Sequence, residues 1–161
     1  MEKLLWILSL SVVILTGCVP PPPEPPKAPD AISLNVPTLI KSGFVRLQQA
    51  PQHFIDGNRV TKSPVQPYLI DFDVVVNLEK SQHVYPDNLK LYAKSLRKKH
   101  RVNCDTQTLE QLSTTYYSEF WGEGEPSPIT VNNLKLTKDY KHSALSMLGR
   151  VVCASLYRHE G

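Results

Sequence analysis

The chain has 161 residues, a formal net charge of +3 and 41% hydrophobic residues. This length suffices for about one domain with a hydrophobic core and no need of a stabilising metal. The small excess of positive charge does not suggest a nucleic-acid-binding protein, and we expect no nucleic-acid partner.

The first segment has the pattern of a bacterial lipoprotein signal. Lys3 supplies a positive charge, and Leu4 to Leu15 form an apolar stretch of twelve residues. Twelve residues are too few to span a bilayer, which takes about 20 residues as a helix. Small residues then lead directly into Cys18, so we expect residues 1–17 to be cleaved and Cys18 to be acylated. A cleaved signal with an incidental cysteine is the weaker alternative.

Acylation would anchor the protein without placing any protein segment inside the membrane. One acyl chain binds only marginally, whereas several chains hold a protein stably. Val19 follows the cysteine, and the absence of aspartate at this position favours the outer membrane over the inner one. We therefore predict a lipid-anchored protein of the cell outer membrane that is exposed at the cell surface.

A proline-rich linker follows the cysteine. It holds half of the chain's fourteen prolines: Pro20, Pro21, Pro22, Pro23, Pro25, Pro26 and Pro29. Such a segment cannot form helices or sheet ladders, and it extends by about 3.1 Å per residue. We assign residues 18–41 to the lipidated N-terminus and linker, and residues 42–161 to the domain.

Short strands are predicted at the start of the domain. The first covers residues 44–48. Two more, at 53–56 and 59–62, flank the sequence Asp56-Gly57-Asn58, which is a good hairpin turn. We therefore predict a hairpin between the second and third strands.

The clearest strand pattern runs from Tyr68 to Glu79. Apolar and polar residues alternate there with a period of two, which is typical of a half-buried strand. The polar side carries Asp71, Asp73 and Glu79, and we expect it to face solvent.

Residues 89–104 and 109–120 are predicted to form a second pair of strands. The first of these segments also shows helical spacing near its start, but the second has the pattern of its hairpin partner, which favours a strand. The sequence Gly122-Glu123-Gly124, followed by Pro126, is predicted to end the second strand.

A basic segment lies within the first strand of this pair. Six cations and no carboxylate fall within twelve residues, and we take as candidate ligand-binding residues Lys90, Lys94, Arg97, Lys98, Lys99, His100 and Arg101. On a strand, every second side chain of this run faces away from Cys104. An exposed row of like charges attracts sulfated glycans, acidic protein surfaces or anionic lipids. The alternative is that these cations only keep a sheet edge soluble and unpaired.

The last predicted element is a helix from about Lys138 to Tyr157, with Thr137 as its N-cap. With Cys18 acylated, Cys104 and Cys153 remain, and two cysteines in an oxidising compartment are more often paired than free. A catalytic thiol would need a neighbouring base, which the sequence does not identify. The fold class is therefore α+β: an antiparallel β-sheet with a C-terminal helix packed on one face and tied to it by a disulfide.

Signs of catalysis are weak. The histidines have no metal-ligand spacing; they are His53, His83, His100, His142 and His159. Asp71 and Asp73 could form a carboxylate pair, but such residues are more often the solvated side of a strand. Because nucleophile-elbow, phosphate-loop and zinc motifs are also absent from the sequence, we expect no enzyme activity, no metal and no cofactor.

Several stretches, in order, resemble the surface-adhesin protein E family: Ser42-Gly43-Phe44-Val45-Arg46-Leu47, Phe72-Asp73-Val74-Val75-Val76-Asn77-Leu78-Glu79-Lys80, Val84-Tyr85-Pro86, Tyr92-Ala93-Lys94-Ser95, Asn103-Cys104, Glu119-Phe120-Trp121-Gly122, Leu136-Thr137 and Val152-Cys153-Ala154. The resemblance implies a lipidated outer-membrane adhesin that binds host matrix and serum proteins such as vitronectin, laminin and plasminogen. It also implies a homodimer, a disulfide that holds the C-terminal helix to the sheet, and a ligand-binding region at about Lys90 to Leu112.

Two functions therefore remain in view. The first is a non-enzymatic outer-membrane adhesin that engages host proteins or sulfated glycans through the basic segment. The second is a periplasm-facing lipoprotein with a structural or inhibitory role, similar to a lysozyme inhibitor. An inhibitor of a cationic enzyme should present an acidic surface, whereas the distinctive segment of this chain is basic.

Overall fold

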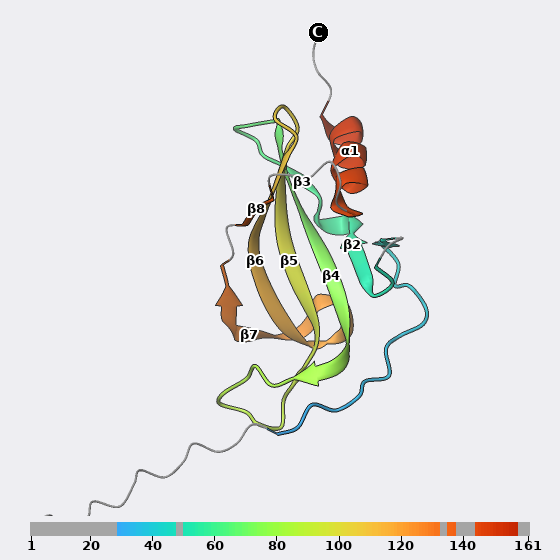
Figure 1. The fold of residues 1–161 in the computed structure, drawn as a ribbon, viewed down its shortest axis with the longest axis vertical. Coiled ribbons are helices and arrows are strands. Elements are labelled where there is room, and N and C mark those ends of the chain that lie inside the picture. The colour runs from blue at the N-terminus through green and yellow to red at the C-terminus, as the bar shows by residue number, and fades with distance from the viewer. Residues whose placement is uncertain (1–28, 48–49, 133–134, 138–143, 158–161) are drawn as a thin grey trace, which may run out of the picture.

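The computed structural model describes residues 29–47, 50–132, 135–137 and 144–157. Its elements are β1 (Phe44–Arg46), β2 (His53–Asp56), the 3-10 helix η1 (Gly57–Arg59), β3 (Thr61–Lys62), β4 (Leu69–Gln82), β5 (Ala93–Asn103), β6 (Thr108–Glu119), the 3-10 helix η2 (Phe120–Gly122), β7 (Glu123–Val131), β8 (Lys135–Thr137) and α1 (Ala144–Leu156). Figure 1 shows a twisted sheet with α1 near one of its ends.

The strands form one antiparallel sheet in the order β1-β2-β4-β5-β6-β7, with β3 paired to β4 and β8 paired to β6. The three long strands β4, β5 and β6 are consecutive and make its centre (Figure 1). The prediction of strands at 68–79, 89–104 and 109–120, and of pairing between the last two, is confirmed. Residues 89–92 form the turn before β5 rather than its first residues.

The predicted hairpin between residues 53–56 and 59–62 is wrong. The strands β2 and β3 both pair with β4, and they lie one after the other along it. The carboxylate of Asp56 accepts a hydrogen bond from the amide of Asn58 (3.1 Å), so the chain turns through η1 instead of a two-residue hairpin.

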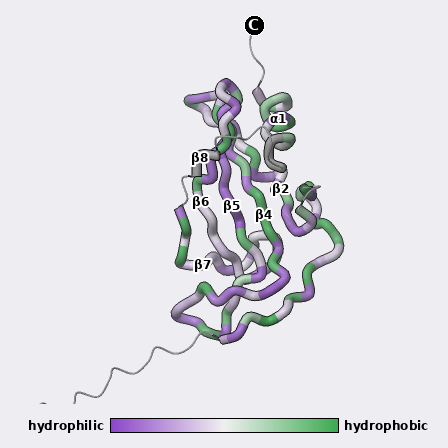
Figure 2. Tube along the Cα trace, viewed as in Figure 1, coloured by the Kyte–Doolittle hydropathy of each residue, from purple (hydrophilic) through white to green (hydrophobic). Residues whose placement is uncertain are grey.

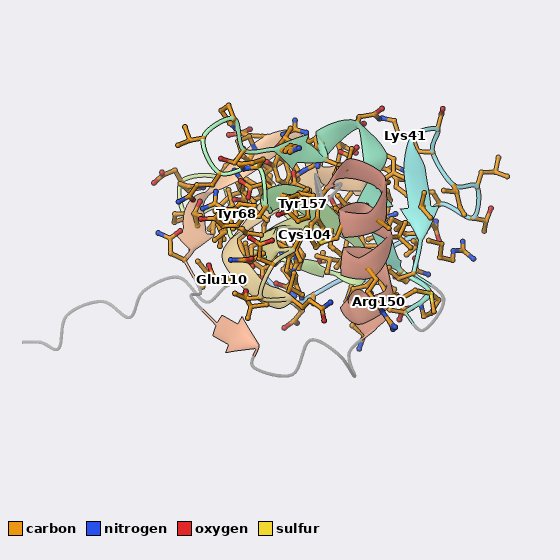
Figure 3. The ribbon with its side chains drawn as sticks, turned by 90° about the horizontal axis from the view of Figure 1, so that it is seen from above. Lys41, Tyr68, Cys104, Glu110, Arg150 and Tyr157 are labelled. Carbon is orange, nitrogen blue, oxygen red and sulfur yellow. A yellow bond between two sulfur atoms is a disulfide. The ribbon has the colours of Figure 1, made fainter. Side chains whose placement is uncertain are left out.

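One side of the sheet, here called the helix face, carries α1. Its hydrophobic core joins Val152 of α1 to buried side chains of the sheet: Leu47, Ile55, Ile70, Phe72, Val74, Val102, Cys104 and Leu109. The predicted disulfide between Cys104 and Cys153 is confirmed and links β5 to α1. In the view along the sheet, Cys104 and Tyr157 lie close to α1 (Figure 3). The predicted α+β fold is thereby confirmed.

The other side, here called the Trp121 face, is also covered. We expected the polar side of residues 68–79 to face solvent, but Asp73, Val75 and Asn77 are all buried. The reason is that η2 crosses over this side and places Trp121 on it. Figure 2 shows β4 as mostly hydrophobic beside a hydrophilic β5.

The sequence pattern predicts no strand at 123–131, yet β7 forms there. Pro126 and Pro128 lie within it. Proline has no amide hydrogen and is tolerated at the edge of a sheet, where one side of the strand needs no partner. Because β7 is the last strand in the sheet order, its prolines are compatible with pairing to β6.

The predicted helix at 138–157 is confirmed from Ala144 to Leu156, and residues 138–143 lie outside the described ranges. Thr137, the predicted N-cap, ends β8 and pairs with Leu109. In the described parts of the chain, no helix has the length and apolar character needed to cross a membrane. Nor do the described residues contain a group of three or more histidine, cysteine or acidic side chains that could hold a metal ion.

The disulfide should supply a large share of the stability. Replacing both partners, Cys104→Ser with Cys153→Ser, frees a loop of 49 residues in the unfolded state and should lower the free energy of unfolding by about 4 kcal/mol. Urea unfolding followed by circular dichroism measures this loss. Wild-type protein treated with a reductant is the control and should match the double variant. Equal midpoints for oxidised wild type and double variant would contradict the prediction.

Candidate ligand-binding surface

The structure divides the predicted basic segment into exposed and buried residues. Lys90 is exposed in the turn before β5. Lys94 donates hydrogen bonds to both carboxylate oxygens of Glu119 (3.0 and 2.9 Å). Arg97 and His100, by contrast, are buried, with 8% and 3% of their surface exposed. The segment is therefore not one continuous exposed row of charge.

The register of β4 and β5 sets the two faces. Arg101 lies opposite Asp71, Lys99 opposite Asp73 and Arg97 opposite Val75. Directly opposed residues share a face of an antiparallel sheet, so the acidic side of β4 and the basic side of β5 lie together on the Trp121 face. Lys98 lies opposite Val74 and so belongs to the helix face, as its parity with Cys104 predicts.

One group of charged side chains on β4 and β5 is partly exposed to solvent; it consists of Asp71, Lys99 and Arg101. Arg101 donates from Nε and Nη2 to the two oxygens of Asp71 (2.6 and 2.9 Å), and Nζ of Lys99 lies 3.6 Å from the same carboxylate. The hydrogen bonds to Asp71 raise the pKa of Arg101 above its usual value. The side chain of Lys99 is 50% exposed. Glu110 of β6 lies opposite Arg101 and also raises its pKa, so these two cations face two carboxylates, and Lys99 is the more exposed cation.

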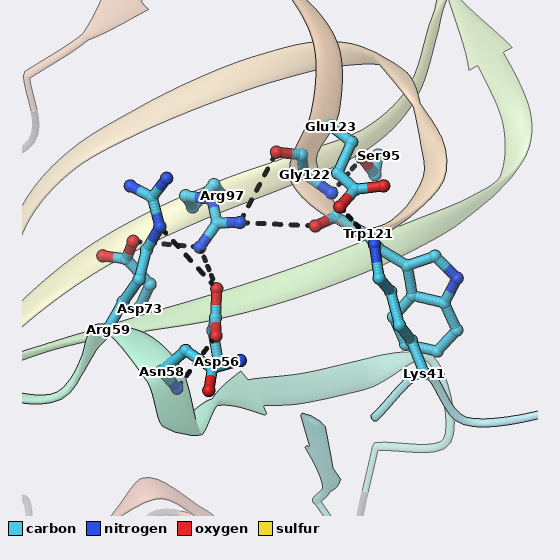
Figure 4. A network of polar contacts seen from close by, with 10 residues as sticks. All are labelled: Lys41, Asp56, Asn58, Arg59, Asp73, Ser95, Arg97, Trp121, Gly122 and Glu123. Atoms are coloured by element: carbon cyan, nitrogen blue, oxygen red, sulfur yellow. Dashed lines mark hydrogen bonds and ion pairs between the residues drawn. The ribbon is translucent and has the colours of Figure 1, made fainter. Parts of the chain in front are cut away.

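The second group is a buried ion-pair network centred on Arg97 (Figure 4). Its Nη1 donates to the carboxylates of Asp56 (2.7 Å) and Asp73 (3.1 Å). Its Nη2 donates to the carbonyl oxygens of Trp121 (3.3 Å) and Gly122 (3.4 Å). Burial opposes the charge of Arg97, but the bonds to both carboxylates outweigh it and raise the pKa of the guanidinium. The network therefore ties β5 to β2, β4 and η2.

The backbone of η2 is shaped to meet this guanidinium. Gly122 has φ +67°, and a Cβ atom there would lie 2.8 Å from Nε of Arg97, so only glycine fits. Trp121 also has a positive φ of 68°. Its amide donates to the Asn77 side chain (2.9 Å), and the amide of Gly122 donates to the Ser95 hydroxyl (2.9 Å). These bonds hold η2 against the sheet.

An aromatic cluster lies next to the network. The ring of Trp121 packs on Phe54 and Phe44, with centroids 4.7 Å and 5.1 Å apart. Aromatic pairs in tilted geometry add stability beyond the burial of their surface. The side chain of Lys41 forms an ion pair with Glu123, just after η2 (Figure 4). The segment before β1 is thereby joined to the start of β7.

His100 is buried on the helix face, next to the hydrophobic core. Its ring stacks on Phe72 with centroids 5.4 Å apart, and Nδ1 lies 3.1 Å from the carbonyl oxygen of Lys98. Burial is the main reason that the pKa of His100 falls to about 4; the hydrogen bond to the Lys98 carbonyl opposes this fall, and the positive charge of Lys98 adds to it. Burial and Lys98 also lower the pKa of His53. Both histidines are therefore neutral at pH 7.

Sequence reasoning missed Asp56, Trp121 and Gly122 as members of the Arg97 network. The alternation correctly separates the acidic side of β4 and the basic side of β5 from the apolar core. The alternation does not give the register between β4 and β5, because the connection at 83–92 is too long to determine which residues lie opposite one another. Asp71 and Asp73, for which a carboxylate pair was the weaker alternative, bind two different sets of cations.

Only part of the basic segment is accessible to a ligand. Arg97 and His100 cannot reach a ligand, because their polar atoms are enclosed by the sheet, η2 and the helix-face core. The side chains that remain available from the predicted set are Lys90, Lys98, Lys99 and Arg101. Of these, Lys99 and Arg101 lie side by side over Asp71 on the Trp121 face.

Removing the buried cation should be far more costly than removing its exposed neighbour. Arg97→Met leaves the carboxylates of Asp56 and Asp73 buried without a counter-charge, and it should lower the free energy of unfolding by about 3–5 kcal/mol. Lys99→Met, on the same strand and face, is the matched control and should cost less than about 1 kcal/mol. Urea unfolding measures both. Equal losses for the two variants would contradict the network's role.

His100 should make the fold less stable in acid. Its folded-state pKa of about 4 lies below the ordinary value of 6.5, so the unfolded chain binds the proton first. The free energy of unfolding should therefore fall as the pH drops from 6.5 to 4, by roughly 3 kcal/mol at about 1.4 kcal/mol per pKa unit. Urea midpoints across this range should change less in His100→Gln, which keeps a hydrogen-bond donor but does not titrate. An unchanged pH profile in this variant would exclude His100 as the source.

Comparison with known proteins identifies the family. The sequence profile described as "Surface-adhesin protein E" matches residues 44–154. Two curated relatives bear the same name, both from Haemophilus influenzae. The protein from strain NTHi 3655 is 34% identical over 152 residues, which cover 92% of this chain and 91% of the relative. The protein from strain KW20 / Rd is 33% identical over the same shares of both chains.

A solved structure of Haemophilus influenzae protein E agrees. It is 31% identical in sequence, with a TM-score of 0.65, and the match covers 78% of this chain and 95% of that one. The match of sequence and of fold extends over nearly the whole length of these relatives, and it includes both the sheet and the disulfide-bonded helix region. The chain therefore belongs to the surface-adhesin protein E family.

Proposed function

We propose that this protein is a lipid-anchored adhesin of the bacterial outer membrane that binds host extracellular-matrix and serum proteins. Membership of the surface-adhesin protein E family over residues 44–154 is the observation that carries the proposal. The protein is not an enzyme on this proposal, and it needs no cofactor. A homodimer, as the family resemblance implies, is part of it.

The N-terminal sequence supports the location. The apolar stretch ending at Gly17-Cys18 has the pattern of a lipoprotein signal, and the proline-rich residues 18–41 would act as the spacer between membrane and domain. The described chain starts at Pro29 and joins the sheet through Ser33, which bridges to Lys80 at the end of β4. In Figure 1 this end of the molecule lies opposite the end that carries α1. A tether at Cys18 would thus leave the α1 end free to point away from the membrane.

The proposed ligand contacts are the exposed cations of the basic segment. Lys99 and Arg101 both contact the carboxylate of Asp71, Arg101 also lies opposite Glu110, and Lys90 is exposed in the preceding turn. Exposed cations such as Lys90 and Lys99 attract acidic protein surfaces or sulfated glycans, and salt screens the attraction. Arg97 and His100 support the strand from within but do not contact the ligand.

Binding to immobilised vitronectin or laminin tests these contacts. The double variant Lys99→Gln with Arg101→Gln should bind roughly tenfold more weakly, which corresponds to about 1.4 kcal/mol. The double variant Lys62→Gln with Lys80→Gln removes the same charge from two other exposed lysines and is the control. Asp71→Asn should strengthen binding, since it releases two cations. Equal weakening by both double variants would show that only net charge matters and would count against this site.

Whole cells test the location and the adhesin role together. External protease should remove the domain from intact cells, and the removal should abolish attachment to coated surfaces. Cys18→Ser should release the protein from the membrane fraction. A domain that resists protease until the outer membrane is permeabilised would instead support the periplasmic structural or inhibitory role, and the adhesin proposal would fail.

A further inference from the structure

The first strand of the sheet has a free edge. In the sheet order β1 is terminal, and no other described strand pairs with it besides β2. The amide of Leu47 donates to the carbonyl of His53 (2.9 Å), and the carbonyl of Gly43 accepts from the amide of Gly57 (2.8 Å). Residues alternate between inward and outward bonding in an antiparallel pair. The amide and carbonyl of Arg46 therefore point away from β2.

The helix-face side of this edge is apolar and exposed. Val45 lies opposite Ile55, on the helix face, and is 60% exposed. Met147 and Val151, one turn apart on the outward side of α1, are 64% and 59% exposed. The two elements are neighbours, because Leu47 at the end of β1 belongs to the same core cluster as Val152 of α1. Figures 1 and 3 both show α1 beside this end of the sheet.

The other side of the edge is positively charged. Arg46 is exposed and lies over the ring of Phe54 at 5.5 Å, on the Trp121 face. On the helix face, Arg150 of α1 is exposed as well. Within the described ranges neither side chain has a carboxylate at ion-pair distance, and the sequences of β1 and α1 contain no acid. A surface helix normally exposes polar and charged residues, whereas α1 exposes an apolar stripe with one cation.

We propose that the edge of β1 and the outward side of α1 form a docking surface for an extended, acidic segment of another protein, which adds to the sheet as a further strand. Main-chain hydrogen bonds to Arg46 provide the pairing. Successive side chains of an added strand alternate between the two faces. Those on the helix face meet Val45, Met147 and Val151, and those on the other face meet Arg46. The preferred ligand is thus a segment in which apolar and acidic residues alternate.

Two other occupants fit less well. The chain's own proline-rich segment lacks the amide donors that a ladder requires. A second copy of β1 would bring two Arg46 side chains close together on one face of the joined sheet, and like charges on paired strands repel. The docking surface lies at the edge of β1 and is separated from Lys99 and Arg101 of β5 by β2 and β4, so it goes beyond the adhesin contacts proposed above.

The test uses the chain from residue 18 with Cys18→Ser, titrated with capped peptides and observed by amide chemical shifts. The acidic probe is Val-Glu-Val-Glu-Val-Glu, and the basic one is Val-Lys-Val-Lys-Val-Lys. The acidic peptide should shift the amides of Arg46 and Val151 and protect the Arg46 amide from hydrogen exchange. Arg46→Glu should reverse the preference between the two peptides.

A matched pair of variants locates the binding. Val151→Asp should weaken the acidic peptide at least tenfold, whereas Val65→Asp, at a residue 85% exposed between β3 and β4, should leave it unchanged. The proposal is overturned by equal effects of these variants, by shifts confined to β7, or by no shifts at millimolar peptide. It is also overturned if the free protein is a dimer whose Arg46 amide is already protected. None of these outcomes depends on attachment to host proteins.

Discussion

The fold of this protein depends on the burial of one guanidinium between two carboxylates. Arg97 leaves the middle of β5 and meets Asp56 from the end of β2 and Asp73 from β4. Its Nη2 donates to two backbone carbonyls of η2. A buried charge without partners is very unfavourable, so all four elements must be in place together. The network therefore couples the short strands at the start of the domain to the long central hairpin.

Both faces of the sheet are consequently covered, each by a different element. On the helix face, hydrophobic packing around Val152 and the disulfide from Cys104 hold α1. On the Trp121 face, η2 is held by amide bonds to Asn77 and Ser95 and by the ion pairs of Arg97. This double cover explains why β4 is buried on both sides although its sequence alternates between apolar and polar residues.

Several positively charged side chains of the basic segment therefore form ion pairs that stabilise the fold. Among the cations of the basic segment, Arg97 is buried and paired with Asp56 and Asp73, Lys94 is paired with Glu119, and Arg101 is paired with Asp71. Charges that are neutralised at short range contribute little to attraction at a distance. The surface that a partner can contact is thus smaller than the whole basic segment. The proposed docking surface at the edge of β1 would add to it.

The sequence by itself determined the central strands, the C-terminal helix and the pairing of Cys104 with Cys153, because these depend on periodicity and on the number of free cysteines. It did not determine how β2 connects to β3, that β7 forms a strand, or that Arg97 is buried. Each of these depends on which strand lies next to which, and the long connections leave that register open. Only the tertiary structure brought Asp56, Asp73 and Gly122 around Arg97 and so decided that this charge is buried rather than offered to a ligand.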